Sequence, residues 1–167
     1  FQHVIDRAEG CLNRLNTDYL DLLLIHWPDH DTPFEETIRA LEQLKQSGKI
    51  RHYGVSNFTP EMMDECEQYG HMAANQVGYH MFDRRMESTV LPHCLDKNIG
   101  FMAYGTLGFG LLSGAFTPET SFGENDWRSS GVAFKLPLFQ TEEFAKELRV
   151  VERLKVIAER NDKSVAQ

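Results

Sequence analysis

The sequence predicts an α/β protein in which parallel strands alternate with helical crossovers. Short apolar runs recur along the chain, and amphipathic stretches with helix-start signals and closing glycines lie between them. By the expected boundaries, these strand–helix units repeat every ~22 to 32 residues, a period similar to that of a (β/α)8 barrel. This order implies parallel strands joined by helical crossovers.

The expected elements follow one another in this order along the chain. Strands are predicted at 22–25, 50–55, 74–79 and 99–104. Helices are predicted near the start up to Leu15, and over 33–47, 60–69, 88–97 and 142–160. The run from Leu22 to Ile25 is short and uniformly apolar, which indicates a strand buried on both faces. Pro28 ends this segment, because proline cannot continue a central strand.

Two of the predicted helices begin with recognisable caps. Thr32 is followed by Pro33 and Glu35, the pattern of a capping box with proline at the first helical position. Thr59 precedes Pro60 in a similar way. A further proline, Pro92, is expected in the first turn of its helix or at a bend, because it cannot occupy a regular helix interior.

Composition and charge exclude several classes of function. Hydrophobic residues make up 41% of the chain and charged residues 25%, so a packed core is feasible. The net charge of −8, without a basic cluster, argues against nucleic acid or an anionic membrane as partner. Three separated cysteines without a CxxC pattern disfavour a disulfide framework or a zinc site, and a reducing cytoplasm fits best. There is no apolar run of membrane-spanning length and no visible signal peptide.

Both ends of the chain suggest an internal piece of a longer protein. Phe1 is not preceded by methionine, and Ser164 has the character of a helix N-cap three residues before the last residue, Gln167. Residues 106–140 are rich in glycine, serine and proline, and we expect an irregular loop over the carboxyl-end rim of the strands. Such a long loop is usually functional or mobile.

The carboxyl ends of the predicted strands carry polar and aromatic residues. They are His26, Trp27, Ser56, Asn57, Gln76, His80 and Tyr104. This rim is where a (β/α) barrel builds its site. Serine, asparagine and glutamine offer the donors and acceptors that hold a carboxamide, and Tyr104 offers a flat face to a ring. Glycines 105, 108 and 110 would let backbone amides approach a phosphate.

Each of these residues also has an ordinary structural explanation. His26 could cap a strand, Ser56 and Asn57 could form a plain turn, Gln76 could be a satisfied polar residue, and the glycines could only punctuate a loop. Their convergence on one rim is what favours a functional site.

Four segments together resemble the aldo-keto reductase family. They are LLLIHWPD, YGVSNF, ANQVGYHMFDRR and YGTLGFGLLSG, in this order and at this spacing. The resemblance covers nearly the whole chain and is strongest over residues 15–114. It implies a (β/α)8 TIM barrel that uses NAD(P)H to reduce aldehydes and ketones. Residues 1–167 would then form a single incomplete domain that is part of this TIM barrel.

The resemblance also implies roles for individual residues. His26 matches the histidine of the catalytic tetrad, which orients the substrate carbonyl, and Trp27 matches a residue that lines the substrate pocket. The nicotinamide carboxamide would be held by Ser56, Asn57 and Gln76, and Tyr104 would stack on the nicotinamide. The loop along the pyrophosphate would begin with Gly105, Thr106, Leu107 and Gly108.

The sequence departs from the family pattern in several places. The family usually has Tyr-Ser-Pro-Leu where this chain has Tyr104 to Leu107, and His80 stands where asparagine or serine is commoner. The tetrad Asp, Tyr and Lys lie in the family on strands before this segment, and the residues that read the adenosine 2′-phosphate lie after it. The chain thus corresponds to the fourth to seventh strands, and by itself it is expected to be inactive.

The resulting prediction is an oxidoreductase that reduces a small carbonyl substrate with NADPH, with NADH left open. No bound metal, nucleic-acid partner or membrane insertion is expected, and the substrate and oligomeric state stay open. One alternative is a cofactor-sensing regulatory subunit without significant turnover. The other is a metal-dependent hydrolase, with potential ligands in His26, Asp29, His30, Asp31 and His80.

Overall fold

The computed structural model describes residues 1–167, which form two compact units. The sheet unit comprises residues 1–78 and 85–104, and the C-terminal unit comprises residues 79–84 and 105–167. Each unit has its own hydrophobic core. No helix of the chain combines the length and apolar character needed to cross a membrane.

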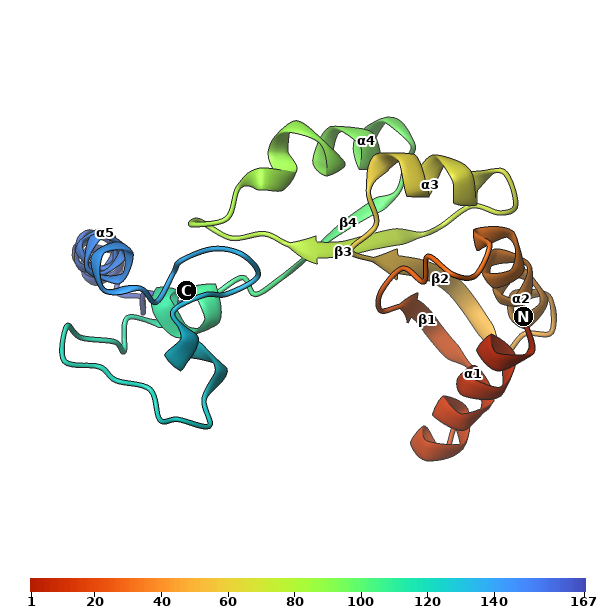
Figure 1. The fold of residues 1–167 in the computed structure, drawn as a ribbon, viewed down its shortest axis with the longest axis horizontal. Coiled ribbons are helices and arrows are strands. Elements are labelled where there is room, and N and C mark those ends of the chain that lie inside the picture. Colours follow the sequence, from red (N-terminus) through yellow and green to blue (C-terminus); the bar gives the residue numbers. More distant parts are fainter. The chain divides into compact units, whose positions relative to one another are not determined.

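The sheet unit is built on four parallel strands in the order of the sequence, as predicted. They are β1 (Leu20–Ile25), β2 (Ile50–Ser56), β3 (Ala74–Gly78) and β4 (Gly100–Tyr104). In the register of the sheet, Ser56 pairs with Gln76 and Gly78 pairs with Tyr104. Because all strands run the same way, their carboxyl ends share one edge of the sheet (Figure 1).

Strand β1 differs from the prediction in its burial. None of its residues is fully buried, and Leu22 is 36% exposed. The expectation of a strand buried on both faces is therefore wrong. Within the residues of this chain β1 pairs with β2 alone, whereas β2 lies between β1 and β3 and has buried residues at five of its seven positions.

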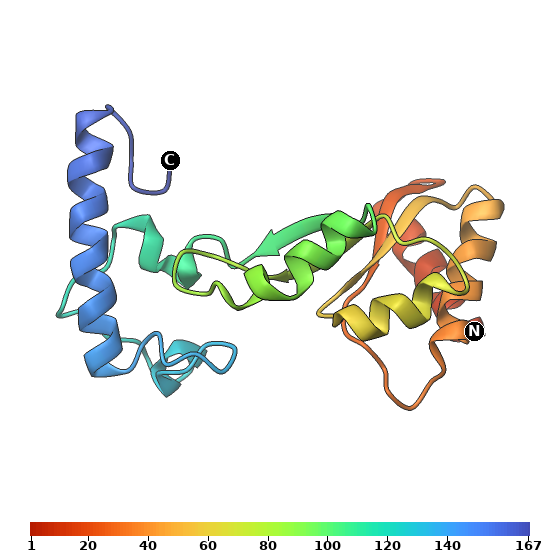
Figure 2. The same cartoon turned by 90° about the horizontal axis from the view of Figure 1, so that it is seen from above.

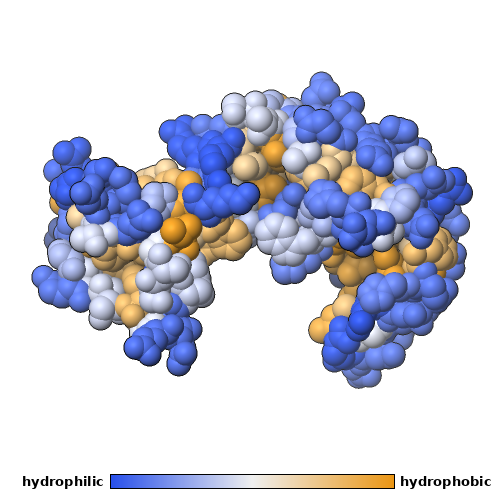
Figure 3. All heavy atoms as spheres, in the orientation of Figure 1, coloured by the Kyte–Doolittle hydropathy of each residue, from blue (hydrophilic) through white to orange (hydrophobic).

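Four helices connect or flank these strands. They are α1 (Gln2–Leu15), α2 (Phe34–Gln46), α3 (Pro60–Glu67) and α4 (Val90–Asp96), the last preceded by the short 3-10 helix η1 (Arg85–Ser88). The helices lie along one side of the sheet (Figure 1). Apolar side chains form the core of this unit. On the face shown in Figure 3, hydrophilic side chains cover much of the outer surface of the helices. The core of this unit is mainly aliphatic, with Leu41 and Val55 fully buried.

The helix starts confirm one predicted cap and contradict the other. The Thr59 hydroxyl accepts a hydrogen bond from the Met62 N–H at 3.4 Å, with Pro60 at the first helical position. In contrast, α2 begins at Phe34 without a side-chain cap, because the Thr32 hydroxyl instead donates to the Asp29 carboxylate at 2.8 Å. The predicted capping box at Thr32 is therefore wrong.

A further proline and a glycine fit their local structure. Pro92 is the third residue of α4, within its first turn as predicted. Gly54 lets β2 pass close to β3, because a Cβ atom at this position would lie 2.3 Å from the Ala74 carbonyl oxygen. The close approach leaves no room for any side chain here.

The C-terminal unit contains little regular structure before its long helix. It has the 3-10 helices η2 (Gly108–Ser113) and η3 (Trp127–Ser130), followed by α5 (Thr141–Arg160), which is the long helix of Figure 2. The core contains Leu111, Leu138 and Leu148 together with a group of phenylalanines. The phenylalanine rings packed in or against this core are Phe82, Phe109, Phe116, Phe122, Phe139 and Phe144.

Arg128 holds part of this segment together. Its guanidinium lies 4.6 Å from the centre of the Phe122 ring and donates to the Asp126 carboxylate at 2.6 Å and to the Phe109 carbonyl at 3.2 Å. Hydrogen bonds from Arg128 hold the pKa of Asp126 below its usual range. The irregular segment 106–140 is thus organised by packed rings and one arginine rather than by backbone ladders.

Candidate functional site

The carboxyl ends of the strands bring together most of the predicted polar residues. His26 follows β1 directly, Ser56 ends β2 and Asn57 follows it, Gln76 lies in β3, and Tyr104 ends β4. Hydrogen bonds join residues from all four strand ends, although they lie 20 to 47 residues apart in the chain. The convergence expected from parallel strands is therefore present in the structure.

Asn57 is at the centre of these hydrogen bonds. Its side-chain Nδ2 donates to the His26 carbonyl at 3.1 Å and to the Ser56 hydroxyl at 3.1 Å. Its Oδ1 accepts a hydrogen bond from the Tyr104 hydroxyl at 2.9 Å, and its backbone N–H donates to the Gln76 carbonyl at 2.9 Å. The residue has a φ of 64°, a left-handed conformation in which asparagine is among the least strained non-glycine residues.

Ser56 and Gln76 lie side by side but present different surfaces. Ser56 is 1% exposed, and its hydroxyl donates to the Gln76 backbone carbonyl at 2.8 Å. The Gln76 side chain is partly exposed. A carboxamide approaching this edge would therefore meet the amide of Gln76 more readily than the hydroxyl of Ser56.

Tyr104 is placed against the end of β3. A Cβ atom on Gly78 would lie 3.3 Å from two atoms of the Tyr104 ring, so the absence of a side chain at this glycine makes room for the ring. The ring is partly exposed. It can thus offer one face to a flat ligand while its hydroxyl is bound to Asn57.

His26 and Trp27 line a hollow bounded by β1 and α1. The two rings lie with centroids 5.9 Å apart, both side chains are exposed, and Trp27 is 53% exposed. The hollow has a volume of about 560 Å³ and extends between β1 and α1, past Leu24 and Ala8. Asp29 also lines it, and hydrogen bonds from Thr32 and from the Asp31 N–H lower the pKa of that carboxyl.

The predicted pyrophosphate loop belongs to the C-terminal unit. Gly105 and Gly108 both have positive φ angles, 66° and 56°, and the Gly108 N–H donates to the Gly105 carbonyl at 2.7 Å. A Cβ atom on Gly105 would lie 2.8 Å from the Phe109 ring. Thr106 and Leu107 between them are exposed. The loop has the tight, glycine-dependent geometry that lets backbone amides approach an anion, and its predicted role stays a prediction.

His80 has a structural environment that its sequence position did not reveal. It is 6% exposed and closes a tight turn with Asp83 through reciprocal backbone hydrogen bonds of 3.1 and 2.9 Å. Its ring Nδ1 accepts a hydrogen bond from the Phe82 N–H. No group of three or more histidine, cysteine, aspartate or glutamate side chains in this chain is placed to hold a metal ion.

Asn75 is a buried polar residue that the sequence interpretation missed. It is fully buried in β3, and its Nδ2 donates to the Phe58 carbonyl at 3.0 Å. This bond fixes the chain just after Asn57. The signal that could have revealed it is the asparagine beside Gln76 within a predicted strand, since a buried polar side chain needs a hydrogen-bond partner.

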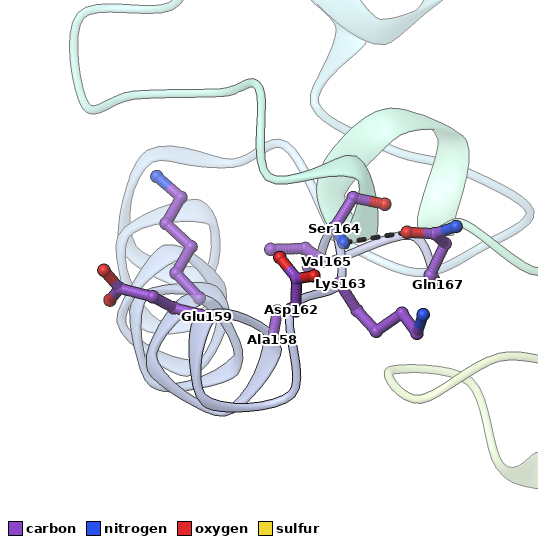
Figure 4. Close-up of a pocket in the computed structure, with 8 residues that line it drawn as sticks. Ala158, Glu159, Asp162, Lys163, Ser164, Val165 and Gln167 are labelled. Atoms are coloured by element: carbon purple, nitrogen blue, oxygen red, sulfur yellow. Dashed lines mark hydrogen bonds between the residues drawn. The ribbon is translucent and has the colours of Figure 1, made fainter.

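A second hollow lies at the end of α5, in the C-terminal unit. It has a volume of about 450 Å³ and is lined mainly by exposed residues, including Glu159, Asp162 and Lys163 (Figure 4). Here the Ser164 N–H donates to the Gln167 side chain at 3.0 Å. This hollow differs from the edge of the sheet because it is lined by charged residues of both signs and encloses no polar groups. Its lining indicates no particular ligand or reaction.

Comparison with known proteins identifies the family. The family model described as "Aldo/keto reductase family" matches residues 2–167. The chain is 41% identical over 137 residues to the aldo-keto reductase YhdN of Bacillus subtilis, covering 82% of this chain and 41% of the relative. It is 33% identical over 155 residues to the NADH-specific methylglyoxal reductase of Escherichia coli, covering 91% of this chain and 45% of that relative.

Solved structures agree with this assignment. The glycerol dehydrogenase AKR11B4 from Gluconobacter oxydans superposes with a TM-score of 0.91 at 39% identity, covering 98% of this chain and 48% of that chain. An aldo/keto reductase from Klebsiella pneumoniae in complex with NADP and acetate has a TM-score of 0.59 at 42% identity, covering 62% of this chain and 37% of that one.

The chain thus spans less than half the length of these relatives. Its parallel sheet with helical crossovers is part of a TIM barrel, as the sequence predicted. The match of the family model over residues 2–167 and the shared fold lead to one conclusion: the chain belongs to the aldo-keto reductase family.

Proposed function

We propose that the whole protein reduces the carbonyl group of a small aldehyde or ketone with NADPH as the preferred cofactor. The observation that carries this proposal is the hydrogen-bonded edge of the sheet, where Asn57 links His26, Ser56 and Tyr104. Family membership supports the reaction class. A relative bound to NADP and another named as NADH-specific show that both cofactors occur among similar proteins.

The residues at this edge fit a nicotinamide. A partly exposed amide at Gln76 and a partly exposed aromatic ring at Tyr104 match a carboxamide and a flat ring, and Gly78 leaves space beneath Tyr104. When bound, NADPH supplies a hydride to the carbonyl carbon. His26 would orient the carbonyl oxygen, and Trp27 would contact the rest of the substrate, because both side chains line the adjoining hollow.

The remaining tetrad groups, Asp, Tyr and Lys, are expected outside this chain. The proton donor to the carbonyl oxygen would then come from the rest of the protein, and this chain alone is expected to bind cofactor without turnover. A cytoplasmic location is proposed on the free state of Cys11, Cys66 and Cys94, two of which are buried. Burial raises the pKa of Cys66 to about 12, which makes that thiol unreactive.

The first test is a titration of this chain with NADPH and with NADH, followed by the fluorescence of the reduced nicotinamide. Saturable binding of the reduced cofactors is expected, and the preference for NADPH is measured in the whole protein, because the residues that read the adenosine 2′-phosphate are expected outside this chain. A folded chain that binds neither cofactor would contradict the proposal. A far-UV spectrum establishes whether the chain is folded.

A second test uses His26→Ala in the whole protein. The substitution should lower turnover by about a hundredfold, the order of a positioned acid–base group, and leave cofactor affinity unchanged. Equal losses of turnover and cofactor affinity would contradict the assigned role. Cofactor binding without measurable turnover in the unmodified whole protein would favour the regulatory-subunit alternative.

A further inference from the structure

The loop that joins β1 to α2 is short and contains two prolines. It comprises residues 26–33, with Pro28 near its start and Pro33 at its end (Figure 1). A proline ring fixes its own φ and restricts the residue before it to extended conformations. Because Trp27 precedes Pro28, the backbone of Trp27 lies in a restricted part of the loop.

The carboxylate of Asp29 closes a turn in the middle of this loop. Its Oδ1 accepts a hydrogen bond from the Asp31 N–H at 3.0 Å, and its Oδ2 accepts one from the Thr32 hydroxyl at 2.8 Å. An aspartate that accepts hydrogen bonds from the residues that follow it stabilises a turn of the backbone. One acidic side chain therefore sets the shape of this loop.

Both ends of the loop are anchored to the rest of the sheet unit. At the end of β1, the His26 carbonyl accepts a hydrogen bond from Asn57 Nδ2 at 3.1 Å. At the start of α2, the Phe34 ring packs against Phe58, with the ring centroids 5.3 Å apart. With both ends fixed, the turn between them leaves little freedom to the segment that carries Trp27.

Packing alone does not fix the Trp27 side chain. Trp27 is 53% exposed, and its ring centroid lies 5.9 Å from that of His26 on the wall of the hollow. Side-chain rotamers depend on the backbone angles of their residue, so the place of this ring depends on where the loop holds its backbone. Asp29 and Thr32 line the same hollow.

We propose that Asp29 is a positioning residue for the substrate, which acts through Trp27 by closing the turn with Thr32. This inference rests on the proposed function, because it assumes that Trp27 contacts the carbonyl substrate. Asp29 then determines how well a substrate fits beside His26, and it leaves the binding of the cofactor unaffected.

Steady-state kinetics of the whole protein with NADPH test this role, with benzaldehyde and methylglyoxal as probe substrates. Asp29→Ala should raise the KM of the probes by about three- to tenfold, the size of one or two lost hydrogen bonds. The kcat should change much less, and the Kd of NADPH should stay the same. A merely structural role would lower the amount of active protein, and hence the apparent kcat, without changing KM.

Thr32 offers a matched pair of variants. Thr32→Val keeps the shape of the side chain and removes the hydroxyl that donates to Asp29. It should raise the KM by about two- to fivefold. Thr32→Ser keeps a hydroxyl and should restore a KM close to that of the unsubstituted protein. The same KM in both variants would overturn the inference.

A double-mutant cycle shows whether Asp29 acts through the tryptophan. Trp27→Ala should raise the KM by itself. In that background Asp29→Ala should add little, because the ring that the turn positions is no longer there. Increases in KM that multiply would overturn the inference and leave the proposed function standing.

Asp31→Ala is the matched control for charge. It removes one negative charge from the same loop and keeps the Asp31 N–H that donates to Asp29. The KM should stay unchanged, and a rise as large as that of Asp29→Ala would overturn the inference, because charge would then be the cause.

Two outcomes separate the inference from what it rests on. If Asp29→Ala does not fold, the two Thr32 variants decide. If the unsubstituted whole protein oxidises no NADPH with either probe, the proposed function fails and the inference fails with it.

Discussion

The two units of this chain are stabilised in different ways. In the sheet unit, aliphatic side chains at regular spacings pack between strands and helices, and backbone ladders link the strands. In the C-terminal unit, residues 106–140 have only two short 3-10 helices, and aromatic rings carry much of the packing. The comparison shows that a segment without regular hydrogen-bond patterns can still have a well-packed interior when enough rings meet in it.

Removing one ring should test this view of the C-terminal unit most severely. Phe144 of α5 is 8% exposed and lies near Phe116, Phe122 and Phe139. Phe144→Ala should cost about 3–5 kcal/mol, as for other large aromatic truncations in cores. Hydrogen exchange should increase throughout residues 106–167 and stay unchanged in β2 and β3. Unaltered protection of 106–140 would show that the rings do not hold this segment.

The corresponding change in the sheet unit is Leu41→Ala in α2. Leu41 is fully buried, so its truncation should cost about 2–5 kcal/mol of unfolding free energy. The matched control is Leu95→Ala, because Leu95 is 83% exposed and its truncation should change little. Urea unfolding measures both variants, and similar losses in the two would contradict the assigned core.

The C-terminal unit should also depend on pH through Glu147. Its Oε2 atom is buried without a hydrogen-bond partner, and burial, with a smaller effect of Glu143, raises the pKa of Glu147 to about 7. Because the pKa is higher in the folded protein than in the free residue, ionisation destabilises the folded state. This loss of folding stability is absent below about pH 4.5 and reaches its full size above about pH 7.

Glu147→Gln should therefore stabilise the chain at pH 8 by about 1–2 kcal/mol, a value reduced for partial solvent exposure, and have little effect at pH 4.5. Thermal unfolding at the two pH values gives the measurement. Glu142→Gln in the first turn of α5 is the control, because Glu142 is exposed. An equal gain from Glu147→Gln at both pH values would show that ionisation is not the cause.

The smallest expected effect compares two threonines of the sheet unit. Thr59→Ala removes a helix cap and should cost about 1 kcal/mol. Thr32→Ala removes a hydrogen bond to Asp29 in an exposed turn and should cost less, because no helix N–H is left without a partner. Chemical unfolding measures the free energy of unfolding of both variants. It tests whether Thr59 caps its helix and Thr32 does not.

The sequence predicted the regular part of this chain well. Spacing of apolar residues located all four strands and the five long helices to within a few residues, and Thr59 marked a helix start. The prediction that β1 is buried on both faces was wrong, because an apolar run has the same composition in a strand with one neighbour as in a strand with two. The predicted helix cap at Thr32 was wrong, because its hydroxyl donates to the neighbouring Asp29 carboxylate instead.

The site could be predicted as a set of residues but not as a network. Parallel strands must end at one edge, so His26, Asn57 and Tyr104 could be brought together from the pattern alone. The hydrogen bond between Asn57 and Tyr104 could not be predicted from the sequence, because it depends on a left-handed backbone at Asn57 and on a ring position allowed by Gly78.

A substitution at Gly54, within β2, could disturb the polar edge of the sheet through the neighbouring strand. A methyl group there would meet the Ala74 carbonyl at 2.3 Å, and β3 would have to shift to accommodate it. The same strand carries Gln76, so the displacement would reach the expected cofactor contact. In a library in which every position is randomised and survivors are selected for carbonyl reduction, we expect position 54 to tolerate only glycine, although it is not among the residues expected to bind cofactor or substrate.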